Sequence, residues 1–353
     1  MKDARLLVRA LAEPGSVVEL DAEGATRLIA LARAESLAGS LAHRLVDVDL
    51  PQGVARILAD ARRAHEHART QALWEAEMCR RALAPLGVPV VLLKGTAYAA
   101  AGLDAGVGRS IGDLDILVPR ADLERVERAL LAAGWEWVKP DPYDDLYYRC
   151  WMHELPPLIH RERDRMIDVH HTILPLTAGP TPDADALIAG SQILPGEELG
   201  LRILAPEDMI VHAAAHLFAD GDLAGGLRNL WDIDRLLRQF AVDPGFWPRL
   251  AQRARLHRLE GPVARALRLA RRLYATPVDP GCTGRPCLAD SLFERRLLAR
   301  DGWGRKTRPA LRFGFYVRSH WLRMPPLMLA RHLLTKARRV RPGAVPDRLQ
   351  AAG

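Results

Sequence analysis

Apolar and polar residues alternate along this chain with two different periods. In residues 1–86 the apolar positions have the three- and four-residue spacing of a helix, most clearly over Ala22–Arg33 and Val54–Leu86. Gly87 and Pro89 then interrupt the pattern, as residues that end helices do. The pattern predicts a helical N-terminal region over residues 1–86.

The next segment, residues 87–175, consists mainly of short apolar runs typical of strands. The predicted strands are Val88–Leu93, Asp113–Val118, Trp135–Val138, Met152–His160 and Arg165–Ile173, and the predicted helices are Asp122–Ala133 and one that starts near Thr96. Such a mixture of strands and helices within about 90 residues predicts an α/β core built on a small mixed sheet.

The C-terminal half returns to helical spacing. A Pro-rich stretch at 175–182 predicts a boundary, and helical periodicity follows from about residue 205 to 275. A Gly- and Pro-rich break over Pro277–Pro286 precedes a basic helical segment. We expect a helical domain at 176–280 and a basic helical tail at 281–353, which makes the chain an α+β protein whose sheet is flanked by helices.

Composition narrows the class of protein. The chain has 353 residues, of which 49% are hydrophobic, and its mean hydropathy is −0.08, as in soluble globular proteins. Its four cysteines are scattered without a Cys-x-x-Cys pair, which argues against a structural zinc site or a disulfide scaffold. The N-terminal residues lack a secretory signal and no apolar run is long enough to span a membrane. We expect a cytoplasmic protein.

Positive charge is in excess, and much of it lies near the C-terminus. The net charge is +7 and the isoelectric point is about 9.5. The tail contains Arg305, Lys306, Arg308, Arg312, Arg318, Arg323, Arg331, Lys336, Arg338, Arg339 and Arg341, interleaved with Phe313, Phe315, Tyr316, Trp321 and Leu327. This pattern fits an anionic partner such as nucleic acid, a membrane surface or an acidic peptide, and equally a solvated face that packs its aromatic residues onto the core.

The most informative short motif is Asp113-Leu114-Asp115 at the head of an apolar run. Because side chains alternate along a strand, Asp113 and Asp115 are expected on one face and Leu114 on the other. Two carboxylates held this close repel each other unless a cation lies between them. Hard oxygen ligands of this kind suit Mg²⁺ or Mn²⁺.

Two further runs supply what a metal-dependent transfer site also needs. Asp168 lies between apolar residues of another strand, with His170 on the same face, and offers a third carboxylate. Lys94-Gly95-Thr96 joins a strand to a helix, where glycine permits close approach and free N–H groups attract phosphate. A salt-bridged Asp168 and a strand-end Lys94 paired with a carboxylate are the simpler alternatives.

These runs resemble a known family. The segments LLKGTAYAA, RSIGDLDILV and HELPPLIHRERDRMIDVHH are similar to the uncharacterised nucleotidyltransferases of the DNA polymerase β-like superfamily. In the resemblance Gly95 and Thr96 match the phosphate turn, although the superfamily usually has serine or glycine in place of Thr96. Asp113 and Asp115 match the paired acids, Asp168 matches the third acid, and Arg109 matches an arginine that often precedes the pair.

The resemblance implies an enzyme that moves a nucleoside monophosphate from an NTP, such as ATP, to an unidentified acceptor and releases pyrophosphate. Asp113, Asp115 and Asp168 would bind Mg²⁺ or Mn²⁺. The phosphates would be held by Lys94, Gly95, Thr96 and Arg109, although Arg109 could equally form a structural ion pair. The alternatives are a non-catalytic nucleotide- or partner-binding module, for example in a toxin–antitoxin or biosynthetic complex, and a nucleic-acid-binding protein that uses the basic tail.

Other patterns resemble sites less closely. Asp232 and Asp234 repeat the Asp-x-Asp spelling within a predicted helix, Leu227–Phe240, where residues two apart point in different directions. Arg228 and Asp232 share a helical face and could pair or line a nucleotide cleft. His212 and His216 have metal-ligand spacing without the glutamate of a zinc protease, so packed or hydrogen-bonded histidines are the preferred interpretation. His153 is a further candidate neighbour of the acidic site.

Overall fold

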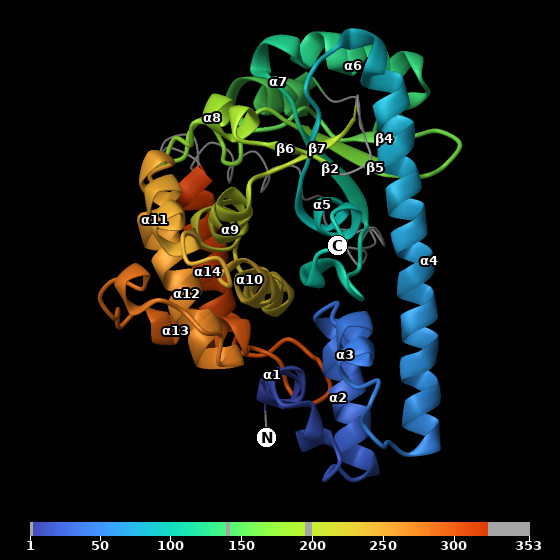
Figure 1. Ribbon diagram of the computed structural model, residues 1–353, viewed down its shortest axis with the longest axis vertical. Coiled ribbons are helices and arrows are strands. Elements are labelled where there is room, and N and C mark those ends of the chain that lie inside the picture. Colours follow the sequence, from blue (N-terminus) through green and yellow to red (C-terminus); the bar gives the residue numbers. More distant parts are fainter. Residues whose placement is uncertain (1–2, 139–141, 195–199, 324–353) are drawn as a thin grey trace, which may run out of the picture.

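The computed structural model describes residues 3–138, 142–194 and 200–323. It has a mixed sheet with helices packed around it, which confirms the predicted α+β class. In Figure 1 the sheet lies in the upper part, the N-terminal helices at the bottom and the C-terminal helices on the left. None of the described helices is long and apolar enough to cross a membrane.

The N-terminal region is helical, as predicted. Its helices are α1 (Arg5–Ala12), α2 (Ala22–Ala34), α3 (Ala38–Arg44) and α4 (Gln52–Leu83). The side chain of Asp21 caps α2 by accepting a hydrogen bond from the N–H of Gly24 at 2.7 Å. Helix α4 has 32 residues and runs from the N-terminal helices to the sheet (Figure 1), so it connects these two parts of the molecule.

The sheet has seven strands in the order β3-β4-β5-β2-β1-β7-β6. The strands are β1 (Val91–Leu92), β2 (Asp113–Leu117), β3 (Trp135–Trp137), β4 (Leu158–His160), β5 (Met166–His170), β6 (Gln192–Ile193) and β7 (Arg202–Ile203). Strands β2 and β5 run parallel at its centre. Helix α5 (Lys94–Ala100) follows β1, and α6 (Leu123–Ala132) precedes β3.

Two parts of the predicted core differ from the structure. The predicted strand Met152–His160 is confirmed only as β4, because Pro156 and Pro157 have no N–H for the sheet and interrupt the pairing. The segment between β3 and β4 contains an unpredicted helix, α7 (Pro142–Trp151). Strands β6 and β7, two residues each, were also not predicted, since such short runs carry no measurable period.

The C-terminal half is helical, as predicted from about residue 205. Its helices are α8 (Ala184–Ala189), α9 (Pro206–Ala214), α10 (Gly226–Phe240), α11 (Phe246–Leu256), α12 (Glu260–Tyr274), α13 (Asp290–Leu297) and α14 (Pro309–Arg323). Because β6 and β7 join the same sheet as β1–β5, the sheet continues past the predicted boundary at 175–176. The four predicted domains stay a prediction, and tail residues 324–353 lie outside the described residues.

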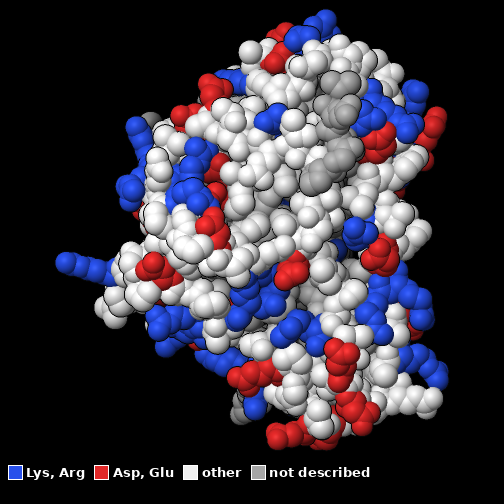
Figure 2. Space-filling model, viewed as in Figure 1, with Lys and Arg blue, Asp and Glu red and all other residues white. Residues whose placement is uncertain are grey.

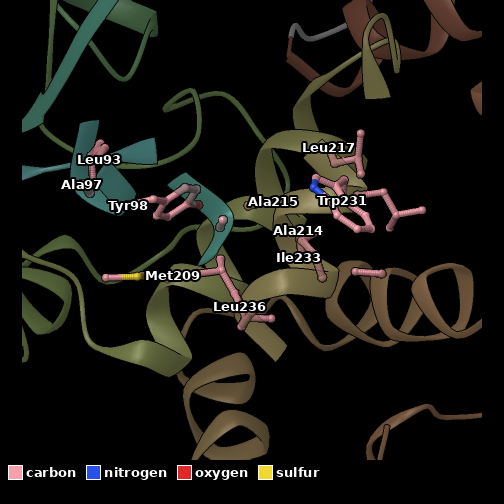
Figure 3. Close-up of a cluster of buried hydrophobic side chains, with 14 of the residues drawn as sticks. Leu93, Ala97, Tyr98, Met209, Ala214, Ala215, Leu217, Trp231, Ile233 and Leu236 are labelled. Carbon is pink, nitrogen blue, oxygen red and sulfur yellow. The ribbon is translucent and has the colours of Figure 1, made fainter. Parts of the chain in front are cut away.

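One hydrophobic cluster runs from the N-terminal helices through the sheet into the C-terminal helices. Figure 3 shows part of it at the junction, with Tyr98 of α5 on one side and Met209 of α9 and Ile233 of α10 on the other. All three side chains are buried. Continuous burial of this kind holds the C-terminal helices against the core and so fixes the cavity between them.

Candidate functional site

The three predicted acidic residues come together at the centre of the sheet. In the parallel pairing of β2 and β5, Asp115 lies directly beside Asp168, and Asp113 lies one pleat earlier on β2. One carboxylate oxygen from each of the three lies within 4.8 Å of the others. Leu114 and Ile116 are buried on the opposite face, as the period of two predicts.

Asp115 is the most enclosed member of this acidic group. Its Oδ1 accepts a hydrogen bond from Lys94 Nζ at 2.7 Å and lies 3.1 Å from His170 Nε2. Burial by itself raises the pKa of Asp115, but the charge of Lys94 and the hydrogen bond from His170 more than offset it, so the pKa lies well below its usual range. Asp115 is therefore an anion held between two cationic partners.

Lys94 reaches Asp115 because of how β1 ends. The N–H of Leu93 donates to the carbonyl oxygen of Asp115 at 3.0 Å, which fixes the residue that follows β1 beside β2. Lys94 then has a φ of 47°, in the left-handed region that non-glycine residues seldom adopt, and begins α5. Burial lowers the pKa of Lys94, but the carboxylate of Asp115 dominates and raises it to about 12.

Asp168 is in a different electrostatic state from Asp115. Burial, followed by the negative charges of Glu154 and Asp115, raises the pKa of Asp168 to about 7. A group of carboxylates packed this closely favours either a proton or a cation among them. The oxygen donors and their spacing fit a hard divalent cation such as Mg²⁺ or Mn²⁺, which Asp113, Asp115 and Asp168 would hold.

A cavity of about 170 Å³ opens beside this acidic group. The residues that line it from the core side include Lys94, Gly95, Arg109, Asp113 and Asp115, and those from the C-terminal helices include His212, His216, Arg228 and Asp232. Of the described residues that we predicted for the site, Thr96 and Asp168 do not line this cavity. Thr96 is buried in α5, and its predicted contact with phosphate stays a prediction.

Arg109 links the core to the C-terminal helices across the floor of this cavity. Its Nε donates to Asp232 Oδ2 on α10 at 2.8 Å, and both side chains are buried. Of the two interpretations of Arg109, the ion pair is therefore present. Gly95 makes room for it, since a Cβ on Gly95 would lie 1.8 Å from Arg109 Nη1. Gly95 was expected to permit a close approach, and the group that approaches it is the guanidinium of Arg109.

A second arginine, Arg228 of α10, lies in the same cavity. The positive charge of Arg109, followed by burial, lowers the pKa of Arg228. A guanidinium group whose charge is destabilised by a neighbouring arginine in a concave site favours an anion beside it. Arg228 was expected either to pair with Asp232 or to line a nucleotide cleft, and in the structure it lines this cavity.

The two histidines of the predicted helical half also line this cavity. His212 lies on α9, and His216 lies in the π-helical turn that follows it. Burial, followed by the positive charge of Lys94, lowers the pKa of His212 to about 3 and that of His216 well below its ordinary value. Both rings are therefore neutral in the pH range where proteins are usually studied. Neutral, packed histidines are the interpretation preferred from the sequence.

Two other predicted features have different outcomes, and one residue near the acidic group was not predicted. His153 packs against His170, with ring centroids 5.1 Å apart, so it does lie beside the acidic group. The described part of the basic tail is partly packed onto the core: Arg318 lies over the Phe293 ring, whereas Trp321 is exposed. Glu154 was not predicted. Its Oε2 lies 3.4 Å from His170 Nδ1, and its only sequence signal is the position next to His153.

Charge on the molecular surface is mixed rather than concentrated. On the face in Figure 2, lysine and arginine side chains are interspersed with aspartate and glutamate. Many arginines are engaged with carboxylates inside the chain, among them Arg253 with Asp208 and Arg300 with Glu35. The positive net charge therefore does not by itself identify a nucleic-acid-binding face.

Comparison with protein families agrees with the geometry. A family model described as an uncharacterised nucleotidyltransferase matches residues 21–275, well over half of the chain, and the chain belongs to this family. The matched region contains β2, β5, the cavity and α10. No curated protein matches the chain.

Proposed function

We propose, since the chain belongs to this nucleotidyltransferase family, that it transfers a nucleoside monophosphate from an NTP to an acceptor in a Mg²⁺-dependent reaction. The observation that carries the proposal is the convergence of Asp113, Asp115 and Asp168 from two parallel strands. A bound divalent cation supplies charge neutralisation and polarisation of the phosphate oxygens. Mn²⁺ fits the same oxygen donors.

The residues around the cavity have separate tasks in this proposal. Asp113 and Asp115 would hold the cations, and Asp168 would complete their ligands and accept the proton from the acceptor hydroxyl. The acceptor oxygen forms a bond to the α-phosphorus, the bond from that phosphorus to the bridging oxygen breaks, and pyrophosphate leaves. Lys94 and Arg228 supply positive charge for the triphosphate. The backbone around Gly95 was also predicted to hold phosphate, and this role belongs to the proposal.

The acceptor is expected between the core and the C-terminal helices. The cavity there is lined by the acidic pair on one side and by His212, His216 and Arg228 on the other. Neutral histidines donate one hydrogen bond and accept another, so this wall suits a polar acceptor such as a hydroxyl or phosphate group.

The test uses the full chain with each of the four α-labelled NTPs, MgCl₂ and a cell extract as the source of acceptor. Transfer of label with release of pyrophosphate is expected from the wild type, and EDTA is expected to abolish it until Mg²⁺ is restored. The matched variants are Asp113→Asn in the acidic group and Asp234→Asn outside it. Full Mg²⁺-dependent activity in Asp113→Asn would overturn the proposal.

A non-catalytic nucleotide-binding module is the alternative outcome of the same experiment. Calorimetry with NTP and Mg²⁺ separates the two, because a module would bind nucleotide without releasing pyrophosphate under any acceptor condition. The presence of all three carboxylates in one group favours catalysis over such a module.

A further inference from the structure

A second group of side chains that could ligate a metal lies next to the acidic group. It consists of His153, Glu154 and His170, each of which offers one ligand atom within 4.8 Å of the others. Glu154 Oε2 lies 3.4 Å from His170 Nδ1 and 3.8 Å from His153 Nε2. Two ligands on one tetrahedral zinc ion lie about 3.4 Å apart, since each bond is about 2.1 Å long.

The backbone holds these three side chains together. The segment that contains His153 and Glu154 runs antiparallel to the end of β5, and Glu154 forms a bridge directly opposite His170. The N–H of Leu155 donates to the carbonyl oxygen of Val169 at 2.9 Å, and that of His171 donates to the carbonyl oxygen of His153 at 2.8 Å. Because these bonds flank the bridge, the ligands are fixed in advance.

The hydrogen bonds within the group leave buried ring nitrogens without hydrogen-bond partners among the described residues. Asp115 is a carboxylate and can only accept, so Nε2 of His170 donates to it at 3.1 Å. Nδ1 of the same ring faces Oε2 of Glu154 at 3.4 Å, and a metal ion that displaces the Nδ1 proton gains a ligand there. Nδ1 of His170 is buried and makes no hydrogen bond within the described part of the chain, and the nitrogen of His153 that faces Glu154 is Nε2, at 3.8 Å.

This arrangement matches the surroundings of metal-bound histidines in general. A ligating histidine usually donates its other ring N–H to a carboxylate, which fixes the tautomer and the orientation of the ring. Here Asp115 is that carboxylate and His170 is the ring. Two imidazoles and one carboxylate are borderline ligands that suit Zn²⁺ rather than Mg²⁺, which prefers oxygen donors alone.

We propose that His153, Glu154 and His170 form a transition-metal site, filled by Zn²⁺, that is distinct from the Mg²⁺ site at Asp113, Asp115 and Asp168. The bound ion fixes the His170 ring and, through it, the position of the Asp115 carboxylate. The zinc site therefore acts as a positioning element next to the acidic group. It does not depend on the proposed transfer reaction, because metal binding is measured without substrate.

The test measures metal binding to the full chain after chelation and desalting. Co²⁺ serves as the spectroscopic probe, because its visible absorption is strong with nitrogen ligands in a four- or five-coordinate site and weak in an all-oxygen octahedral one. We expect one tightly bound Zn²⁺ per chain in the presence of millimolar Mg²⁺. We also expect a strong Co²⁺ spectrum that Zn²⁺ displaces.

Matched variants assign the ligands. His153→Gln and Glu154→Gln are each expected to weaken Zn²⁺ binding by roughly 100-fold or more, above the range for loss of an outer partner. His171→Gln is the control, because its Nε2 lies 3.2 Å from the carbonyl oxygen of Met152, away from the group. Asp113→Asn is the second control and is expected to retain Zn²⁺ while it loses Mg²⁺.

Zinc X-ray absorption spectroscopy on the wild type identifies the ligands directly, even if a variant fails to fold. Scattering from two imidazole rings on the bound zinc is the expected result. The proposal is wrong if the wild type binds no Zn²⁺, if the bound zinc shows no imidazole scattering, or if Asp113→Asn removes the Co²⁺ spectrum while His153→Gln leaves it intact. The three side chains would then form only a hydrogen-bonded cluster.

Discussion

Two Asp-x-Asp sequences in this chain, one on β2 and one on α10, place their carboxylates in opposite ways. On the strand, Asp113 and Asp115 share a face and converge with a third carboxylate. On the helix, Asp232 reaches Arg109 in the cavity, whereas Asp234 accepts hydrogen bonds from Thr276 and two arginines elsewhere. The same three-residue pattern therefore contributes to a cluster of carboxylates in one element and to separate ion pairs in the other.

The comparison teaches that the period of the element determines what a short motif can do. A strand repeats every two residues, so its paired carboxylates repel each other and favour a cation. A helix turns by about 100° per residue, so each carboxylate there meets a different neighbour. The helical pair nevertheless contributes one member, Asp232, to the wall of the same cavity.

The largest expected effect is on activity, in the strand pair. Asp113→Asn removes one cation ligand from an exposed position and should lower turnover about 1,000-fold, because metal-ion stabilisation of the transition state is worth several kcal/mol. Its unfolding free energy should stay within about 0.5 kcal/mol of the wild type. Labelled transfer measures turnover, and chemical denaturation measures the unfolding free energy. Unchanged transfer in Asp113→Asn would contradict a special role for the pair on β2.

The second effect is on stability, in the helical pair. Asp232→Asn leaves the buried guanidinium of Arg109 without its carboxylate and should cost about 3–5 kcal/mol of unfolding free energy. Urea denaturation at neutral pH measures this cost. The double variant Arg109→Met with Asp232→Leu is the control and should recover most of the loss, because no charge is then left unpaired. A single variant as stable as the wild type would contradict the buried pair.

A smaller loss of stability is expected at the other half of the helical motif. Asp234→Asn weakens the hydrogen bonds from Arg235, Arg238 and Thr276, and should cost about 1.5–3 kcal/mol. Its two arginines are partly exposed and remain hydrated, so the cost stays below that at Asp232. Turnover per folded molecule should be unchanged, and a deficit comparable to that of Asp113→Asn would place Asp234 in the site.

The smallest expected effects concern two glycines in helices. Gly95→Ala brings a Cβ onto the guanidinium of Arg109 and should destabilise the protein by about 1–3 kcal/mol. Gly53→Ala in α4 is the matched control, since nothing lies within 4 Å of the new Cβ, and should stabilise by about 0.5–1 kcal/mol. Thermal and urea unfolding of both variants measure the difference, and equal shifts would contradict the close approach of Arg109 to Gly95.

Much of the fold could be predicted from the sequence because its longer elements have clear periods. Helices α2, α4, α6 and α10 begin and end within a few residues of their predicted bounds, and β2 and β5 are confirmed as strands. Two-residue strands and the helix α7 could not be predicted, because the first have no period and the second follows an irregular apolar pattern.

The acidic group could be predicted because order along the chain and alternation along a strand determine it. The partner of Arg109 could not, since Asp232 lies 123 residues later and only the packing of α10 against the core brings the two together. Glu154 was missed for a similar reason: its neighbour His170 is opposite only through the antiparallel bridge. Long-range partners depend on the topology of the fold, which the residue pattern of a single sequence does not reveal.

The Arg109–Asp232 pair determines how much of the chain is needed to build the cavity. A shorter chain that ended after the sheet would bury an arginine with no anion and lack one wall of the cavity, so strand pairing alone cannot complete this part of the molecule. The closing contact has a large sequence separation, and contacts of this kind form late in folding. The smallest autonomous folding unit that carries the cavity therefore includes α10, in accord with a family whose limits extend to residue 275.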